Sequence, residues 1–195
     1  MQEEARAVER TAPPPLQDVG LNFDPTLVEG DVAQLQPKAQ PQHESGKTYQ
    51  TDDCSITGGG LDSQGDWEVE GIAMVSDVPI TYLGYVNRDS GVIEEVGHPL
   101  DGRAIEDTIL IYPKGSGSTV APYVLMGLIY TGKGPKAIVN RDVCSLTLPA
   151  CSLLNLPYSH GYEKDPCIAV NDGDLVKITK SGEQVTLQVV ERVGE

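Results

Sequence analysis

The segment TILIYPKGSGST, residues 108–119, contains the transition that decides the fold. Residues 108–112 form a continuous apolar run that ends at Pro113, which is typical of a β-strand covered on both faces. A loop with two glycines follows, and from Val120 apolar residues recur at helical spacing as far as Gly132. Pro122 is compatible with that helix only in its first turn. The segment therefore predicts a buried strand, a glycine loop and a helix in succession.

The flanking sequence predicts more strands and one more helix around this unit. Strand patterns occupy residues 67–75, 92–95, 136–140, 167–170, 175–178 and 185–190. Residues 143–154 predict a short helix interrupted by Pro149. A strand, loop, helix and strand with strand-rich ends favour an α/β fold, specifically a three-layer β/β/α domain over residues 67–195.

Residues 1–66 differ in composition from the rest of the chain. They hold 6 of the 14 prolines, and 12 acidic residues against 4 basic ones. Such a Pro-, Gln- and Glu-rich stretch buries little apolar surface, so we expect an extended, largely irregular N-terminal arm. It is either a flexible tail or an arm that wraps a partner. The glycines at 58–60 predict a flexible hinge between arm and domain.

The overall charge of the chain argues against two classes of binding partner. Lys and Arg number 14 and Asp and Glu 29, a net charge of −15, which disfavours binding to nucleic acid or to an anionic membrane. No apolar run approaches the roughly 18 residues of a membrane span. The start, Met1-Gln2-Glu3-Glu4, lacks the pattern of a secretory signal, and four cysteines do not make a disulfide scaffold. We therefore expect a cytoplasmic protein.

Ser118 at the end of the glycine loop is the main site candidate. A helix N-terminus presents unpaired N–H groups that suit a phosphate or a carboxylate, and small residues let the backbone approach a ligand. A serine here can equally be a structural helix cap. The loop lacks the Gly-Lys-Ser/Thr ending of a phosphate-binding Walker loop and the Gly-x-Ser-x-Gly frame of a nucleophile elbow. Local chemistry alone leaves the cap and the functional serine both open.

Five short motifs, found in order, resemble those of one enzyme family. They are SDVPITYLG at residues 76–84, GVI at 91–93, HPLDG at 98–102, PKGSGST at 113–119 and GPKAIVN at 134–140. Through these motifs residues 67–190 resemble the small swivelling domain of aconitase X proteins. Within that family the sequence is most similar to the separately encoded small subunits of archaeal-type phosphomevalonate dehydratases.

This resemblance implies a hydro-lyase built as a heterodimer. In aconitase-like enzymes the large subunit holds an iron–sulfur cluster, one iron of which acts as a Lewis acid on the leaving hydroxyl, and the small domain contributes a serine base. Gly117-Ser118-Thr119 matches the family's Gly-Ser-Ser/Thr, so the resemblance gives Ser118 the base role. It also implies that this chain binds no cluster itself and is active only with the large subunit.

The implied substrate is (R)-5-phosphomevalonate, which loses water to give anhydromevalonate phosphate in the mevalonate pathway of isoprenoid biosynthesis. Its anionic groups would contact the loop, so the expected substrate-binding residues are Lys114, Gly115, Ser116, Gly117 and Thr119. The family loop usually reads Gly-Arg-Gly-Ser, and Ser116 replaces that arginine here. Two alternatives therefore stay open: the small subunit of a related dehydratase, such as one acting on cis-3-hydroxy-L-proline, and a non-catalytic interaction module.

The cysteines and histidines give no metal-binding pattern. Cys54, Cys144, Cys151 and Cys167 contain no Cys-x-x-Cys pair, so we expect no metal ligation by this chain. Cys144 and Cys151 are interpreted as small buried apolar residues, which could share a helix face. His98 is interpreted as a turn residue rather than a catalytic one, and His160 as an exposed loop residue.

Overall fold

Four parallel strands form the centre of the fold in the computed structural model, which describes residues 49–50 and 54–193. In spatial order they are β8 (Tyr158–His160), β7 (Ala137–Asn140), β5 (Ile109–Tyr112) and β3 (Trp67–Val75). Every residue of β5 and β7 is buried. This confirms the strands predicted from the two continuous apolar runs, which are covered on both faces.

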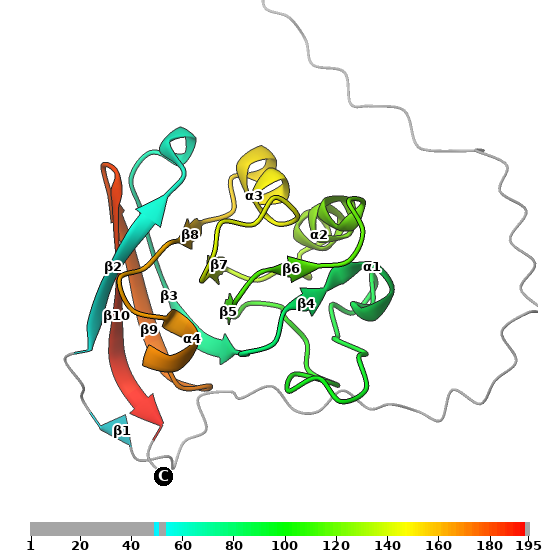
Figure 1. The fold of residues 1–195 in the computed structure, drawn as a ribbon, viewed down its shortest axis with the longest axis horizontal. Helices are drawn as coiled ribbons and strands as arrows, with labels where there is room; N and C mark the ends of the chain where they lie inside the picture. The colour runs from blue at the N-terminus through cyan, green and yellow to red at the C-terminus, as the bar shows by residue number, and fades with distance from the viewer. Residues whose placement is uncertain (1–48, 51–53, 194–195) are drawn as a thin grey trace, which may run out of the picture. The chain divides into compact units, whose positions relative to one another are not determined.

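The two faces of these strands belong to two separate cores. Side chains alternate along a strand, so Leu110 and Tyr112 lie in one core with α2, whereas Ile109 and Ile111 lie in the other with β9 and β10. On β7 the same alternation places Ile138 in the core with α2, and Ala137 and Val139 in the other core. The parallel strands are therefore the middle of three layers, β/β/α, as the sequence predicts (Figure 1).

The outer β-layer is antiparallel and joins the parallel strands at both sides. It consists of β9 (Leu175–Ser181), β10 (Gln184–Val193), β2 (Ser55–Gly60) and the short β1 (Tyr49–Gln50). β9 pairs with both β3 and β10, and β2 pairs with both β10 and β8. The hydrogen-bonded strands therefore form a closed ring, in which neither side of the parallel group is left as an unpaired edge.

The helical layer covers the other face of the parallel strands. It contains α2 (Ala121–Tyr130) and α3 (Leu148–Leu154), preceded by the short α1 (Tyr82–Tyr85). Pro122 and Pro149 both lie in the first turn of their helices, where a missing N–H leaves no hydrogen bond unmade. Pro149 therefore lies in the first turn of α3, which begins at Leu148, rather than interrupting a longer helix over residues 143–154.

Three local predictions are wrong. The glycines at 58–60 are part of strand β2, because the closed ring supplies backbone partners on both sides. Residues 167–170 do not form a strand; Asp165 caps the short helix α4 (Pro166–Ala169) by accepting the Cys167 N–H at 2.9 Å. Residues 92–95 make only isolated bridges, from Val92 and Ile93.

Part of the predicted N-terminal arm belongs to the sheet. β1, β2 and the 3-10 turn η2 (Asp62–Gln64) all precede the boundary placed at residue 66, and β2 is hydrogen-bonded to strands from the C-terminal half. The predictions for residues 1–48 lie outside the described residues. Within the described part of the chain, no helix has the length and apolar character that crossing a bilayer requires.

Candidate active site

The glycine loop lies at the carboxyl end of β5 and is held there by a second, two-stranded sheet. β6 (Gly115–Ser116) pairs in parallel with β4 (Ile80–Thr81), and the Ile80 N–H donates to the Lys114 carbonyl at 3.3 Å. In open parallel sheets and in closed parallel barrels alike, ligands commonly bind just beyond the carboxyl ends of the strands. Two of the motifs that carry the family resemblance, at residues 76–84 and 113–119, therefore meet in space at the place where a ligand is expected.

Gly117 has a backbone conformation that favours glycine. Its φ is +87°, and a Cβ atom at this position would lie 2.9 Å from the Thr81 Cγ2 atom. The close approach of β4 and the left-handed conformation both exclude a side chain here. This glycine sets the direction in which the chain leaves β6 towards Ser118.

Ser118 stands two residues before the N-cap of α2 and is half-buried. Its Oγ accepts the Val120 N–H at 3.3 Å, and its carbonyl accepts the Ala121 N–H at 2.9 Å. The N-cap residue itself, Val120, makes no side-chain cap. The hydroxyl thus contributes one local turn bond, and the residue as a whole is partly exposed.

The other predicted site residues surround this hydroxyl along the same loop. Gly115 is buried, Ser116 is half-buried, and Lys114, Gly117 and Thr119 are exposed. Residues 108–141 contain four cations and no acidic residue, although the chain carries −15 overall. Lys133 and Arg141 form ion pairs, whereas Lys114 makes none among the described residues. The loop therefore offers an exposed ammonium group that no carboxylate among the described residues pairs with.

A chain of buried hydroxyl groups lies near the strand that carries the loop. The Tyr82 and Tyr112 hydroxyls are 2.7 Å apart, and the Tyr112 hydroxyl is 3.1 Å from Thr147 Oγ1. Burial raises the pKa of both phenols above the usual value of tyrosine. These groups therefore stay protonated, and they link α1, β5 and the segment before α3 by neutral hydrogen bonds.

The cysteines differ from their sequence interpretation in one respect. Cys151 is a fully buried residue of α3, as expected. Cys144 is also buried, but it precedes α3 and its thiol is hydrogen-bonded to Gly115, so the two do not share a helix face. Sequence spacing could not indicate this contact, because 29 residues separate the partners.

The described residues do not fit an iron–sulfur cluster. No three His, Cys, Asp or Glu side chains among them are close enough together to hold a metal ion. Cys144 and Cys151 are both buried in the domain, so their thiols are not available as ligands at its surface. A cluster would therefore need ligands from outside the described part of this chain.

The two histidines in the described part of the chain, His98 and His160, make structural contacts. His98 is buried, and its Nδ1 accepts the Leu100 N–H at 3.1 Å, which agrees with the turn role expected for it. His160 ends strand β8 and is half-buried rather than exposed as expected, with its ring 5.7 Å from that of Tyr158. Burial lowers the pKa of His160, which keeps it neutral near pH 7.

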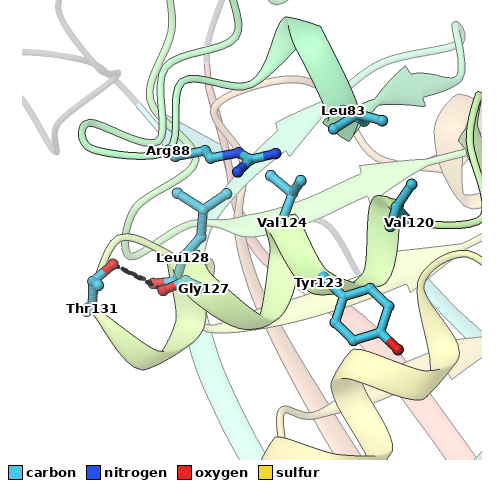
Figure 2. A pocket seen from close by; sticks show the side chains of 8 residues that line it. All are labelled: Leu83, Arg88, Val120, Tyr123, Val124, Gly127, Leu128 and Thr131. Atoms are coloured by element: carbon cyan, nitrogen blue, oxygen red, sulfur yellow. Dashed lines mark hydrogen bonds between the residues drawn. The ribbon is translucent and has the colours of Figure 1, made fainter. Parts of the chain in front are cut away.

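Two grooves flank α2 immediately beyond Ser118. The first, of about 390 Å³, lies between α1 and α2 and includes Val120, Tyr123 and Arg88 among its lining residues (Figure 2). The second, of about 360 Å³, lies between α2 and α3 and includes Thr119, Tyr123 and Leu153. Ser118 is not among the lining residues of either. Tyr123 is 70% exposed and borders both grooves, so the surface next to the loop is apolar and open.

Comparison with known proteins places this geometry in a family. Residues 63–187 match the family described as the aconitase X swivel domain. The chain is 34% identical over 112 residues to the phosphomevalonate dehydratase small subunit of Methanosarcina acetivorans, covering 57% of this chain and 78% of that one. It is 36% identical over 95 residues to the protein of that name from Pyrococcus abyssi, covering 49% and 73%.

A solved structure has the same fold. The crystal structure of Thermococcus kodakaraensis aconitase X in its holo-form superposes with a TM-score of 0.59 at 25% identity, covering 69% of this chain and 98% of that one. The family match spans the parallel strands, the glycine loop, both main helices, β9 and the start of β10. The chain belongs to the aconitase X swivel domain family.

Proposed function

We propose that this chain is the small subunit of a two-subunit hydro-lyase that converts (R)-5-phosphomevalonate to anhydromevalonate phosphate. The observation that carries the proposal is the Ser118 hydroxyl, half-buried at the start of α2 and held by a glycine loop at the carboxyl end of β5. The relatives named phosphomevalonate dehydratase small subunit support the choice of reaction and substrate.

In this reaction Ser118 takes a proton from the carbon next to the substrate carboxylate. The C–H electron pair forms the new C=C bond as the hydroxyl on the following carbon leaves, so the balance is one substrate giving one alkene and one water. A serine hydroxyl is a weak acid, so it acts as a base only in a strongly electropositive site. The N-terminus of α2 contributes part of that field, and we assign the rest to the partner.

The substrate carries a phosphate and a carboxylate, and the loop offers matching groups. Lys114 provides an exposed ammonium group, and the backbone from Gly115 to Thr119 lies directly before a ten-residue helix. The loop itself, residues 113–119, contains no acidic residue, and the carboxylate of the neighbouring Asp142 is paired with Arg141. We therefore propose Lys114, Gly115, Ser116, Gly117 and Thr119 as the substrate-binding residues of this subunit.

The rest of the site belongs to a large subunit. We assign to it the iron–sulfur cofactor that the family resemblance implies, and we propose that the chain alone is inactive. The name "small subunit" borne by the relatives supports such a partner. The cytoplasmic location expected from the sequence stays a prediction.

The function is tested by reconstitution. A tagged chain is used to isolate its large subunit, and the pair is incubated with (R)-5-phosphomevalonate while loss of one water is followed by mass spectrometry. We expect conversion by the pair and none by the chain alone, with iron in the purified complex.

Parallel incubations separate the alternatives. Conversion of cis-3-hydroxy-L-proline instead of the phosphorylated substrate would favour the related dehydratase, an alternative that stays open because Ser116 replaces the family arginine. An iron-free partner with no conversion of either compound would overturn the enzyme proposal in favour of an interaction module.

We place the large subunit on the exposed side of α2 next to Ser118, because a partner that completes the site must cover the surface adjoining it. Tyr123 is the central exposed side chain there, bordering both grooves. We expect Tyr123→Glu to weaken co-purification of the large subunit by about 30-fold, since a buried aromatic anchor often contributes 2 kcal/mol or more.

Ile168→Glu is the matched control for this test. Ile168 is 78% exposed on α4, which lies away from α2 (Figure 1), so the change also places a charge at an exposed apolar position. Pull-down followed by quantitative immunoblotting measures both variants. Equal recovery of the large subunit with the two variants would exclude the α2 surface as the contact.

A further inference from the structure

We propose that Cys144 is a positioning residue that fixes the glycine loop, and through it the Ser118 hydroxyl; this inference rests on the proposed function. The Gly115 N–H donates to Cys144 Sγ at 3.1 Å, and the thiol donates to the Gly115 carbonyl at 3.8 Å. One side chain therefore satisfies both backbone groups of a buried loop residue three positions before Ser118.

Cys144 is itself anchored on two sides. Its backbone N–H donates to the buried Tyr158 hydroxyl on β8 at 3.2 Å. Its carbonyl accepts the N–H groups of Thr147 at 3.1 Å and Leu148 at 2.9 Å, where α3 begins. The thiol is thus fixed relative to both the sheet and the helical layer, and a rigid group of this kind can transmit its position to the loop.

The space around Gly115 is closed, which makes the contact specific. A Cβ atom added at Gly115 would lie 3.2 Å from Thr147 Oγ1, 3.3 Å from Cys144 Sγ and 3.3 Å from Leu146 Cβ. The loop backbone therefore packs directly against residues 144–147. On its other side β6 pairs with β4, so Gly115 is held between that strand and the Cys144 thiol.

The consequence for catalysis follows from the shortness of the loop. Only Ser116 and Gly117 separate Gly115 from Ser118, so a shift of the Gly115 peptide moves the hydroxyl. Displacing a catalytic group by about 1 Å can lower a rate on the order of 100-fold. Cys144 touches no reacting atom, and its role is to keep this displacement from occurring.

The test compares Cys144→Ala with Cys151→Ala. Both changes remove the same atom from a buried position, but the thiol of Cys151 has no described hydrogen bond to the loop. Amide hydrogen exchange is measured by NMR on the full chain at Gly115 and at Val120, whose N–H is bonded to Ser118 Oγ. We expect exchange at both amides to rise at least tenfold in Cys144→Ala and less than threefold in Cys151→Ala.

The kinetic arm uses the reconstituted pair. We expect Cys144→Ala to lower kcat about 10- to 100-fold with KM within threefold, and Cys151→Ala to stay within threefold in both constants. Cys144→Ser keeps a donor and an acceptor on a shorter side chain, so it should restore part of the amide protection and part of kcat. If Cys144→Ala does not fold, Cys144→Ser is compared with Cys151→Ala in its place, in both the exchange and the kinetic measurements.

The outcomes separate the two proposals. A pair that is inactive with wild-type chain overturns the proposed function, whatever the exchange rates. An active pair in which Cys144→Ala and Cys151→Ala have the same kcat, or in which Gly115 exchange does not change, overturns the positioning role alone.

Discussion

Ser118→Ala in the reconstituted pair is expected to lower the turnover rate by a factor of order 10³ or more while leaving assembly with the large subunit intact. The substitution removes the only oxygen that the chain is proposed to supply to the reacting carbon. The half-buried position of Ser118 and its place before α2 make it reachable from outside the domain. Steady-state kinetics and analytical gel filtration of the complex measure the two quantities.

A matched control is available for the structural contribution of Ser118. Its Oγ accepts the N–H of Val120, two residues on, at 3.3 Å, and Ser90 Oγ accepts the N–H of Val92 in the same way at 3.3 Å. Both alanine variants should lose about 1 kcal/mol of unfolding free energy or less. Only Ser118→Ala should lose activity; if Ser90→Ala and Ser118→Ala behave alike in the rate assay, Ser118 is a turn residue and not the base.

Gly117→Ala is expected to have the second largest effect, lowering the rate on the order of 100-fold and the stability by about 1–3 kcal/mol. Two causes add. Alanine is strained at a φ of +87°, and its Cβ would lie 2.9 Å from Thr81 Cγ2. The loop must therefore move away from β4, which displaces Ser118. Thermal unfolding and kinetics of the pair measure the stability and the rate.

Two further variants separate these causes. Gly97 has nearly the same φ, +88°, and an added Cβ there would meet nothing within 4 Å, so Gly97→Ala should show only the backbone strain of about 1 kcal/mol. Combining Gly117→Ala with Thr81→Ser removes the clashing Cγ2 atom and should restore part of the rate. A double variant no better than Gly117→Ala would show that contact with β4 does not position the loop.

The parts of the fold that depend on local patterns could be predicted from the sequence. The buried strands β5 and β7 follow from continuous apolar runs, and α2 follows from helical spacing after a glycine loop. The candidate site was also local, since Lys114 to Thr119 are contiguous. Their proximity needed no tertiary information.

Other parts depend on contacts between distant residues and left no local signal. Three consecutive glycines suggest a hinge, yet β2 is a strand because β8 and β10, more than 90 residues later, pair with it. Residues 167–170 suggest a strand, yet the cap by Asp165 and the first-turn proline make α4. The thiol of Cys144 reaches Gly115 across 29 residues, which no periodicity encodes.

The sequence by itself indicated the buried strands β5 and β7, the position of the glycine loop and the serine at its end, because apolar runs and the backbone freedom of glycine are local properties of the chain. Only the tertiary structure decided that β4 and Cys144 hold that loop from two sides and that the strands close into a ring. Those decisions rest on hydrogen bonds and packing between segments far apart in the chain, whose partners become defined only when the layers assemble.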